Sequence, residues 1–327
     1  MQRPNYKVAV LGAGAIASHH FDAIGRTAGF EACAVADIHE SRGGEIADRY
    51  GITAYRDYRE MIEQERPDAA AIALPHYLHM EAAVFAAERG CHLMLEKPMA
   101  LSTAECDRIM EAAQAANVRL LIGHTQHYMA HNLYAKQLVQ RGEIGQVVMI
   151  HDIRHTDYFQ PSRPDWFLKR SKSGGGILAN LGTHSIDKIQ WLTEGKVRKV
   201  SATISHHGSR GDVEGSGMIY LELNNGVSAT IVQSGYAGAP RNETEIIGTH
   251  GMLKLRTGDS LWLSNGGEYK QLEVPHTASP FELQYAELLR AIQSPDNRFD
   301  SAQYGRGVLA VLEAVYRAAK TGEGQYV

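Results

Sequence analysis

The sequence predicts an α/β protein in which a doubly wound parallel sheet is followed by an α+β domain with an open, mostly antiparallel sheet. Three observations predict this class. Short apolar strands alternate with helices over the first third of the chain, this alternation stops near residue 123, and strands joined by turn residues fill residues 197–274. Strand–helix alternation indicates a parallel sheet, because parallel neighbours need a crossover, whereas short turns join antiparallel neighbours.

In the first third, apolar runs of strand length alternate with helical stretches. The expected strands are residues 7–11, 31–36, 53–55, 69–74, 92–95 and 119–123. The expected helices end near residue 26 and then span 41–50, 58–65, 79–89 and 102–117. The run 69–74 is continuously apolar, which is typical of a parallel strand buried on both faces. Ser102 and Glu105 form a capping box that starts the last of these helices.

The remaining two thirds follow a different pattern. We expect a helix at 131–141, a strand at 146–152, an irregular segment at 154–173, a helix from 174–176 to about 192, the strands of 197–274, and helices at 281–293 and 302–319. The expected domains are therefore 1–123 and 124–327. Long irregular segments in compact domains are usually functional or disordered, so the segment 154–173 is a candidate for substrate binding.

The composition excludes several classes of protein. Of 327 residues, 33 are Lys or Arg and 37 are Asp or Glu, so the chain lacks the basic excess of nucleic-acid and membrane-surface binders. No apolar run approaches the roughly 18 residues of a membrane helix. Cys33, Cys91 and Cys106 are odd in number and lie in apolar runs, which indicates buried thiols in a reducing compartment. We expect a cytoplasmic protein that binds neither nucleic acid nor membrane.

A glycine-rich turn follows the first strand directly. Residues 12–17 read G-A-G-A-I-A, a G-x-G-x-x-A pattern that opens a helix. In this pattern Gly12 allows the tight turn, Gly14 lets the backbone approach a pyrophosphate, and Ala17 keeps the helix close to the sheet. Asp37 ends the second strand, where its carboxylate would meet ribose hydroxyls and repel a 2′-phosphate. The pattern predicts a Rossmann domain that binds NAD; NADP stays possible because Arg42 is near. The alternative is a glycine-rich turn in a nucleotide-free domain.

Two further motifs carry polar residues. Residues 96–98 read E-K-P at the carboxyl end of a predicted parallel strand, where α/β sheets bind ligands; a strand-end salt bridge is the alternative. Three glycines, 174–176, precede a helix on which Asn180, His184 and Asp187 share one face by their spacing. That face could simply be solvated. Gly182 inside the same helix indicates a close packing or ligand requirement, since it costs about 1 kcal/mol relative to Ala.

With these motifs in this order, the chain resembles the Gfo/Idh/MocA oxidoreductases over nearly its whole length. Residues 74–79, L-P-H-Y-L-H, resemble the cofactor-loop motif P-N-x-x-H of that family, with His76 in place of Asn and His79 retained. Residues 142–145, G-E-I-G, resemble its turn into the second domain. The resemblance implies an active site between an NAD(P)-binding domain and a substrate-binding and oligomerisation domain.

The resemblance also implies site residues. Lys97 corresponds to the catalytic lysine of the family, His184 to its acid/base, and Asn180 to a position that usually carries Asp. An amide can donate or accept a hydrogen bond but cannot take a proton. The residues expected to bind the cofactor are Gly12, Gly14, Ala15, Ile16, Asp37, Pro75, His79, Glu96 and Lys97.

Oxidation of a secondary alcohol needs a hydride acceptor, a base and stabilisation of the alkoxide. Nicotinamide, His184 and Lys97 would supply these in turn. We expect a dehydrogenase or reductase acting on a sugar, inositol or related polyol. The residues expected to bind substrate are His124, His155, Tyr158 and Trp166. The alternatives are an enzyme that uses bound NAD for transient oxidation during elimination or glycoside cleavage, and a non-enzymatic NAD-binding regulator.

Metal and partner expectations complete the hypothesis. The 16 histidines include His124, His127 and His131 close together, but no pattern has the spacing of a structural zinc site, so we expect no metal. The paired His19 and His20 follow the glycine-rich turn; one of them could approach the cofactor, although exposure on the helix surface is the default. We expect a homodimer or homotetramer that associates through the strands of 197–274.

Overall fold

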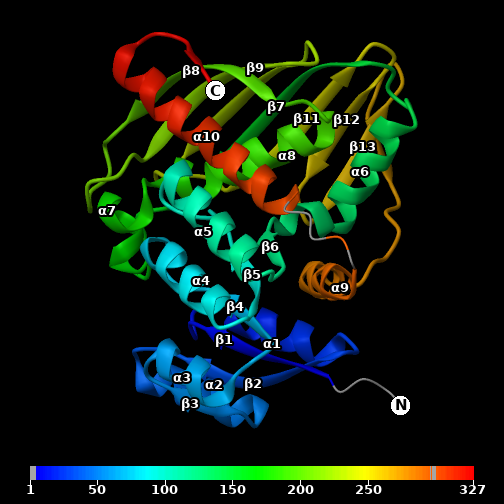
Figure 1. Cartoon of the computed structure of the whole chain (residues 1–327). Coiled ribbons are helices and arrows are strands. Elements are labelled where there is room, and N and C mark those ends of the chain that lie inside the picture. The colour runs from blue at the N-terminus through cyan, green and yellow to red at the C-terminus, as the bar shows by residue number, and fades with distance from the viewer. Residues whose placement is uncertain (1–4, 295, 297–299) are drawn as a thin grey trace. The chain divides into compact units, whose positions relative to one another are not determined.

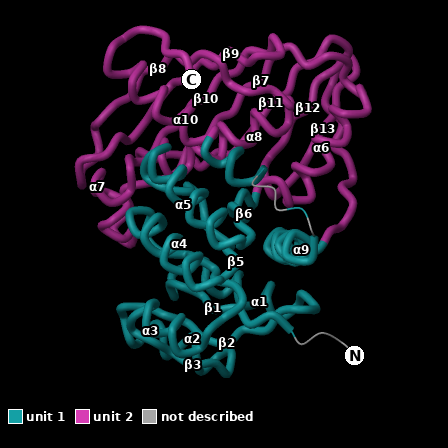
Figure 2. Tube along the Cα trace, in the orientation of Figure 1, with its two compact units in different colours: residues 1–125, 278–306 teal, residues 126–277, 307–327 magenta. Residues whose placement is uncertain are grey.

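The computed structural model describes residues 5–294, 296 and 300–327, and within them the chain divides into two compact units (Figure 2). The first comprises residues 1–125 and 278–306, and the second comprises residues 126–277 and 307–327. The expected boundary at residue 123 lies close to the first division. The segment 278–306, far along the chain, belongs to the first unit.

The first unit contains a parallel sheet with the order β3-β2-β1-β4-β5-β6 (Figure 1). Its strands are β1 (Tyr6–Leu11), β2 (Phe30–Ala36), β3 (Thr53–Tyr55), β4 (Ala69–Ile72), β5 (His92–Glu96) and β6 (Leu120–Gly123). The crossover helices are α1 (Ala17–Arg26), α2 (Glu40–Tyr50), α3 (Tyr58–Glu65), α4 (His79–Glu88) and α5 (Thr103–Ala115). Strands β2 and β3 are added on one side of β1, and β4, β5 and β6 on the other. The switch point of the topology therefore lies between β1 and β4, and ligands of doubly wound sheets bind at such a point.

Helix α9 (Pro280–Gln293) packs against α1 in the first unit. Its Tyr285 and Leu288 are buried in one core with Val8, Phe21 and Ile24. Ser279 caps this helix by accepting a hydrogen bond from the Glu282 backbone N–H at 3.2 Å, and Pro280 occupies its first turn. The apolar face of α9 therefore completes the core around the first helix after the glycine-rich turn.

The second unit contains a mixed sheet with the order β14-β13-β12-β11-β7-β10-β9-β8-β15. Its strands are β7 (Val147–His155), β8 (Val197–Ser205), β9 (Ser216–Leu223), β10 (Ser228–Ser234), β11 (Arg241–Gly248), β12 (Met252–Arg256), β13 (Ser260–Ser264), β14 (Lys270–Leu272) and β15 (Gln325–Tyr326). Described neighbours pair antiparallel except β7 with β10. The prediction of a parallel sheet followed by a mostly antiparallel one is confirmed.

Helices contact one face of this second sheet. Helix α8 (Thr183–Thr193) contacts β7 and β10, and α6 (Ala130–Gln140) contacts β12, β13 and α8. The remaining helices are α7 (Arg170–Ser173) and α10 (Asp300–Thr321), which begins in the first unit and continues in the second. Burial alternates along β9, so that Met218 and Tyr220 are exposed while their neighbours are buried. This alternation indicates a sheet with one covered and one open face.

Three local expectations differ from the structure. β7 continues to His155, so the first two residues of the expected irregular segment are strand, because pairing with β10 and β11 extends to that point. Residues 165–168 and α7 form short helical turns inside the same segment. Residues 178–182 form a π-helical turn before α8, where a uniform helix was expected. Such turns are rare and are often found at functional sites.

The cysteines are free thiols, as expected, but only Cys91 and Cys106 are fully buried, whereas Cys33 is partly exposed. Burial raises the pKa of Cys33 to about 11 and that of Cys91 to about 12, so both stay protonated at neutral pH. No helix in the described ranges is long and apolar enough to cross a membrane.

Candidate active site

The glycine-rich turn between β1 and α1 has the conformation that its sequence predicts. Gly12 has a φ of +103°, and a Cβ there would lie 2.6 Å from the carbonyl oxygen of Ala73, which follows β4. Only glycine tolerates both conditions. A Cβ added at Gly14 would meet no protein atom within 4 Å, and this glycine is exposed. The turn is thus closed toward the sheet and open on its outer side, as a loop that receives a pyrophosphate needs to be.

Asp37 joins the end of β2 to this turn. Its carboxylate accepts hydrogen bonds from the backbone N–H of Ala13 at 2.9 Å and of His39 at 2.8 Å, and pairs with Arg42 at 2.9 Å. Burial opposes ionisation of Asp37, but these donors outweigh burial and hold its pKa below the ordinary value. Asp37 is therefore charged at neutral pH, and the donor set fits an acid that faces a ribose. Arg42 partly neutralises it.

The E-K-P motif lies at the end of β5, and His79, the first residue of α4, lies beside it. Glu96 ends β5 and Lys97 and Pro98 follow it; the Lys97–Pro98 peptide bond is cis, and Lys97 is partly exposed. The buried His79 ring contacts two carbonyl oxygens, that of Pro98 at 2.9 Å from Nδ1 and that of Leu74 at 2.8 Å from Nε2. Burial lowers the pKa of His79, although these carbonyls favour protonation. His79 thus links the segments after β4 and β5, which border the switch point.

A buried polar chain supports the carboxylate of Glu96. His20 Nε2 lies 3.4 Å from Glu96 Oε1, and His20 Nδ1 lies 3.0 Å from the Tyr285 hydroxyl. The Tyr285 hydroxyl thus bonds to Nδ1, while Nε2 faces the carboxylate at ion-pair distance and makes no hydrogen bond in the described structure. Burial opposes ionisation of Glu96, but His20, with Lys97 and His79, outweighs it and lowers the pKa. The expectation that His20 lies on the helix surface is wrong, because α9 covers it; His19 is the exposed member of the pair.

The second unit builds its site around residues 174–176. Glu214 is fully buried, and its Oε1 accepts hydrogen bonds from the backbone N–H of Gly176 at 2.8 Å and of Leu178 at 3.0 Å, and from the Tyr316 hydroxyl at 2.9 Å. A Cβ at Gly176 would collide with the carbonyl oxygen of Glu214. The three-glycine signal therefore reflects close packing around a buried carboxylate that caps the start of the helical segment.

Asn180 and Tyr158 lie together in this unit. Asn180 belongs to the π-helical turn and is 9% exposed, and its side chain is near enough to the Tyr158 phenol to affect the pKa of that group. Burial, reinforced by the charge of Glu214, raises the pKa of Tyr158 far above its ordinary value, so the phenol stays neutral. His184, in the first turn of α8, is partly exposed. The structure thus places two predicted residues, Asn180 and Tyr158, near each other.

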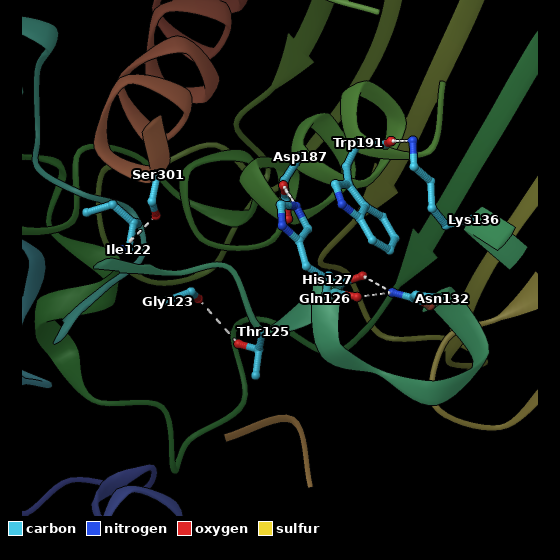
Figure 3. A network of polar contacts seen from close by, with 10 residues as sticks. All are labelled: Ile122, Gly123, Thr125, Gln126, His127, Asn132, Lys136, Asp187, Trp191 and Ser301. Carbon is cyan, nitrogen blue, oxygen red and sulfur yellow. Dashed lines mark hydrogen bonds and ion pairs between the residues drawn. The ribbon is translucent and has the colours of Figure 1, made fainter. Parts of the chain in front are cut away.

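Asp187 lies one turn after His184 and is fully buried. Its Oδ1 lies 2.6 Å from Nε2 of His127 (Figure 3), and the His127 ring stacks on Trp191 with centroids 4.7 Å apart and an interplanar angle of 10°. Lys136 donates to the carbonyl oxygen of Trp191 at 2.6 Å. This network fixes α8 to the segment 125–128, and it gives His127 a structural partner within the second unit.

A buried ion pair holds α8 to the sheet. Lys188 Nζ lies 2.7 Å from Asp152 Oδ2, and the two side chains are 2% and 1% exposed. Asp152 also accepts hydrogen bonds from Ser185 and, at 2.7 Å, from Thr244, while Lys188 donates to Thr257 at 3.1 Å. Burial opposes ionisation of Asp152, but Lys188 and the two hydroxyls outweigh it and lower the pKa. The helix that carries His184 is therefore anchored to β7 and β11 by a fully partnered pair.

The remaining predicted residues are distributed over both units. His124, at the end of β6, lies edge-on to Tyr304 with ring centroids 5.3 Å apart in the first unit, which also contains Lys97. His155 ends β7, and Trp166 stacks on its neighbour Phe167 in the second unit. None of these contacts tests the expected roles. Over the described ranges, no group of three or more His, Cys, Asp and Glu side chains could hold a metal ion.

Sequence reasoning missed several residues of these networks. Glu214, Asp152, Lys188 and Tyr285 lie far along the chain from the residues they contact, and no local spacing indicated them. The only sequence signals were indirect: the three glycines indicated a close neighbour without naming it, and the pair His19–His20 indicated a helix position without indicating which ring is buried.

Comparison with known proteins places both units in one family. Residues 6–124 match the family described as "Oxidoreductase family, NAD-binding Rossmann fold", and residues 132–254 match the GFO/IDH/MocA C-terminal domain. The protein is a member of the Gfo/Idh/MocA oxidoreductase family. The resemblance inferred from the motifs is confirmed, and so is an NAD-binding fold as the cofactor domain.

Individual relatives of this Gfo/Idh/MocA protein differ in activity. It is 30% identical over 203 residues to a 1-carboxy-3-chloro-3,4-dihydroxycyclohexa-1,5-diene dehydrogenase of Comamonas testosteroni, covering 62% of this chain and 50% of that protein. It is 29% identical over 225 residues to a 2,7-anhydro-N-acetylneuraminate hydratase of Mediterraneibacter gnavus, covering 68% and 60%. The matched stretch therefore spans between half and two thirds of these relatives. The crystal structure of aldose-aldose oxidoreductase from Caulobacter crescentus, complexed with glycerol, superimposes with a TM-score of 0.90 at 25% identity, covering 99% of this chain and 100% of that one.

Proposed function

We propose that the protein is an NAD-dependent oxidoreductase that transfers a hydride between nicotinamide and a secondary alcohol or ketone of a sugar, inositol or related polyol. The observation that carries the proposal is the turn at the β1–β4 switch point. Gly12 closes it toward Ala73, Gly14 leaves its outer side open, and Asp37 binds the Ala13 N–H from the end of β2. Family membership and the dehydrogenase and oxidoreductase names of the relatives support the same chemistry.

The roles of the residues follow from their chemistry. NAD, when bound, supplies the hydride acceptor. The ammonium of Lys97 stabilises the negative charge that develops on the substrate oxygen. The imidazole of His184 accepts the proton of that hydroxyl, and Asn180, whose amide cannot take up a proton, orients the substrate or the imidazole. Asp37 discriminates against a 2′-phosphate, and Pro75, His79 and Glu96 shape the cofactor side.

Substrate binding and assembly belong to the same proposal. We assign substrate contacts to His124, His155, Tyr158 and Trp166, whose rings and polar atoms suit the C–H faces and hydroxyls of a sugar. The open face of the second sheet, with Met218 at 63% and Tyr220 at 43% exposure, supports a homodimer or homotetramer formed through β8–β10. We propose a cytoplasmic location from the three free thiols.

The test is a panel of polyols, aldoses and keto-sugars incubated with NAD or NADH, followed by the absorbance of reduced nicotinamide. At least one substrate should give turnover. Lys97→Ala should lower kcat much more than it weakens NAD binding, because the charge acts on the developing alkoxide. The exposed Lys270, replaced in the same way, provides the matched control. Tight NAD binding without turnover on any member of the panel would instead favour the NAD-binding regulator, which needs neither Lys97 nor His184.

A second candidate function uses the same NAD site. In this reaction the substrate would be oxidised only transiently at the NAD site, to permit elimination or glycoside cleavage, with no net redox change. Asn180 in place of the usual Asp, and the hydratase name of one relative, favour this candidate. The two reactions are distinguished by product analysis. In the second, dehydrated or cleaved product accumulates while free reduced nicotinamide does not.

A further inference from the structure

Arg154 lies at the end of the central strand of the second unit without a carboxylate partner of its own. It is the penultimate residue of β7 and is partly buried. Across the described residues, its guanidinium makes no hydrogen bond and no ion pair. Burial lowers its pKa from the ordinary value, against the opposing charge of Asp152. A desolvated cation without a partner is costly, so such an arrangement calls for an anionic group.

The carboxylate nearest to Arg154 along the strand is already fully engaged. Asp152 pairs with Lys188 at 2.7 Å and accepts hydrogen bonds from Ser185 and Thr244. Its two oxygens are thus occupied by one cation and two hydroxyls, and it contributes only a longer-range attraction to Arg154. Arg163, another arginine without an ion pair in the described part of the chain, differs because its guanidinium lies over the Tyr158 ring, 4.0 Å from the centroid.

The position of Arg154 places it on the helix-facing side of the sheet. Side chains alternate along a strand, so Arg154 lies on the same face as Asp152, the face that α8 covers. Its neighbours across the sheet are Gln233 on β10 and Asn242 on β11. Gln233 donates to Ser185 at 2.8 Å, and its buried Oε1 has no partner among the described residues. This row of polar side chains therefore lies beneath the start of the helix that carries His184.

Arg154 also lines an open hollow of about 550 Å³ within the second unit. Two more arginines line it, but Glu243 pairs with both, with Arg241 at 2.8 Å and with Arg256 at 2.8 Å. His155 lines it as well, and its buried Nδ1 has no partner in the described structure. Asp259 and the paired Glu243 also line the hollow, so that among its three arginines Arg154 is the one without an ion pair in the described structure.

We propose that Arg154 binds a carboxylate of the substrate, and that the substrate is a sugar acid or other polyhydroxy acid and not a neutral polyol. The inference rests on the proposed function and names its substrate class. A guanidinium matches a carboxylate with two parallel hydrogen bonds, and this geometry discriminates an acid from the corresponding neutral sugar. The size of the hollow suits a group as small as a carboxylate with its adjoining hydroxyls.

Direct binding to the NAD-loaded protein tests this inference. Calorimetry compares matched pairs of probes, D-galacturonate with D-galactose and D-gluconate with D-sorbitol. The acids should bind at least about tenfold more tightly than their neutral partners. Arg154→Gln should remove this preference without weakening the neutral probes, and Arg154→Lys should retain part of it, since it keeps the charge but loses the paired geometry. Arg241→Gln, in the same hollow but with a carboxylate partner, should leave it unchanged.

The possible outcomes separate this inference from the proposed function. Unchanged NAD affinity and circular dichroism show that Arg154→Gln is folded. Acids that bind no better than neutral sugars, or an equal loss in Arg241→Gln, overturn the carboxylate site. Turnover of neutral polyols, with the matched acids turned over no better, leaves the proposed function intact and refutes the inference. A preference for acids that depends on Arg154, without turnover of any probe, supports the site and counts against the dehydrogenase.

Discussion

Replacing Lys188 by methionine should destabilise the second unit by about 3 kcal/mol. Removing one partner of a buried ion pair typically costs about 3–5 kcal/mol, because the other charge is left uncompensated. Lys188 and Asp152 are 2% and 1% exposed and 2.7 Å apart, so water cannot replace the missing ammonium. Asp152 would keep its hydrogen bonds from Ser185 and Thr244, which places the expected loss near the lower end of the range.

The double variant Asp152→Asn/Lys188→Met tests whether the loss comes from the uncompensated carboxylate. It removes both charges and keeps similar volumes, and apolar or neutral replacements of buried pairs are often nearly neutral. The double variant should therefore recover about 2 kcal/mol or more of the loss in the single variant. Lys270→Met, a surface replacement on β14, should change stability by less than about 0.5 kcal/mol and provides the control.

The contribution of Asp152 to stability should depend on pH with opposite signs in the native protein and in Lys188→Met. In the native protein the pKa of Asp152 is below its ordinary value, so its contribution to stability is present above the unfolded-state pKa of about 4 and is lost as the pH falls through the folded-state value. In Lys188→Met the unpaired, buried carboxylate should have a raised pKa. The variant should therefore gain stability relative to the native protein as the pH falls from 8 toward about 5.

The assay is urea unfolding followed by tryptophan fluorescence. All three tryptophans, Trp166, Trp191 and Trp262, lie in the second unit, so this signal reports the unfolding of that unit. A loss below about 1 kcal/mol in Lys188→Met, or a double variant as unstable as the single one, would refute the reasoning that the pair anchors α8.

Three further predictions follow. Asp37→Ser should erode the preference for NAD over NADP, because it removes the carboxylate that repels a 2′-phosphate; calorimetry that finds equal NADP binding by the native protein would contradict this. Tyr285→Phe should lower stability by about 1 kcal/mol, since it removes the hydrogen bond to His20 at 3.0 Å, and an unchanged thermal midpoint would argue against the buried chain. Asn180→Asp adds a carboxyl at a position that is only 9% exposed, so burial should raise its pKa; the variant should be less stable than the native protein at pH 8 and recover as the pH falls to about 5, and a pH-independent difference would be inconsistent with this.

Several features of the fold could be predicted because they depend on local sequence. Residues 69–74 are continuously apolar, and β4 (Ala69–Ile72) is fully buried in the middle of a parallel sheet. The serine half of the capping box predicted at Ser102 forms, with the Glu105 N–H bound to the serine hydroxyl, while the Glu105 carboxylate accepts from the Leu101 N–H, one residue before the cap. Gly12 has the backbone conformation that its motif requires. In each case the interaction joins residues that are close in the chain.

The expected site also has parts that could be predicted from the sequence and parts that could not. The approach of Asp37 to the turn after β1 could be predicted, because the order of strands in a doubly wound sheet places β2 beside β1. The irregular segment after residue 154 was harder to predict, since β7 extends into it only through pairing with strands from 228–248. The individual roles of Lys97, His184 and the substrate contacts stay predictions for the experiments above.

The sequence by itself determined the fold class, the order of the elements in the first unit and the nucleotide-binding turn, since these follow from hydrophobic periodicity, capping and glycine conformation over short stretches. Only the tertiary structure decided which polar side chains are buried and with which partners. Tyr285 reaches His20 across 265 residues, Glu214 reaches Leu178 across 36, and Lys188 takes the carboxylate of Asp152 so that Arg154 is left without one. Burial and charge pairing depend on which segments the chain brings together in space, and no local pattern contains that information.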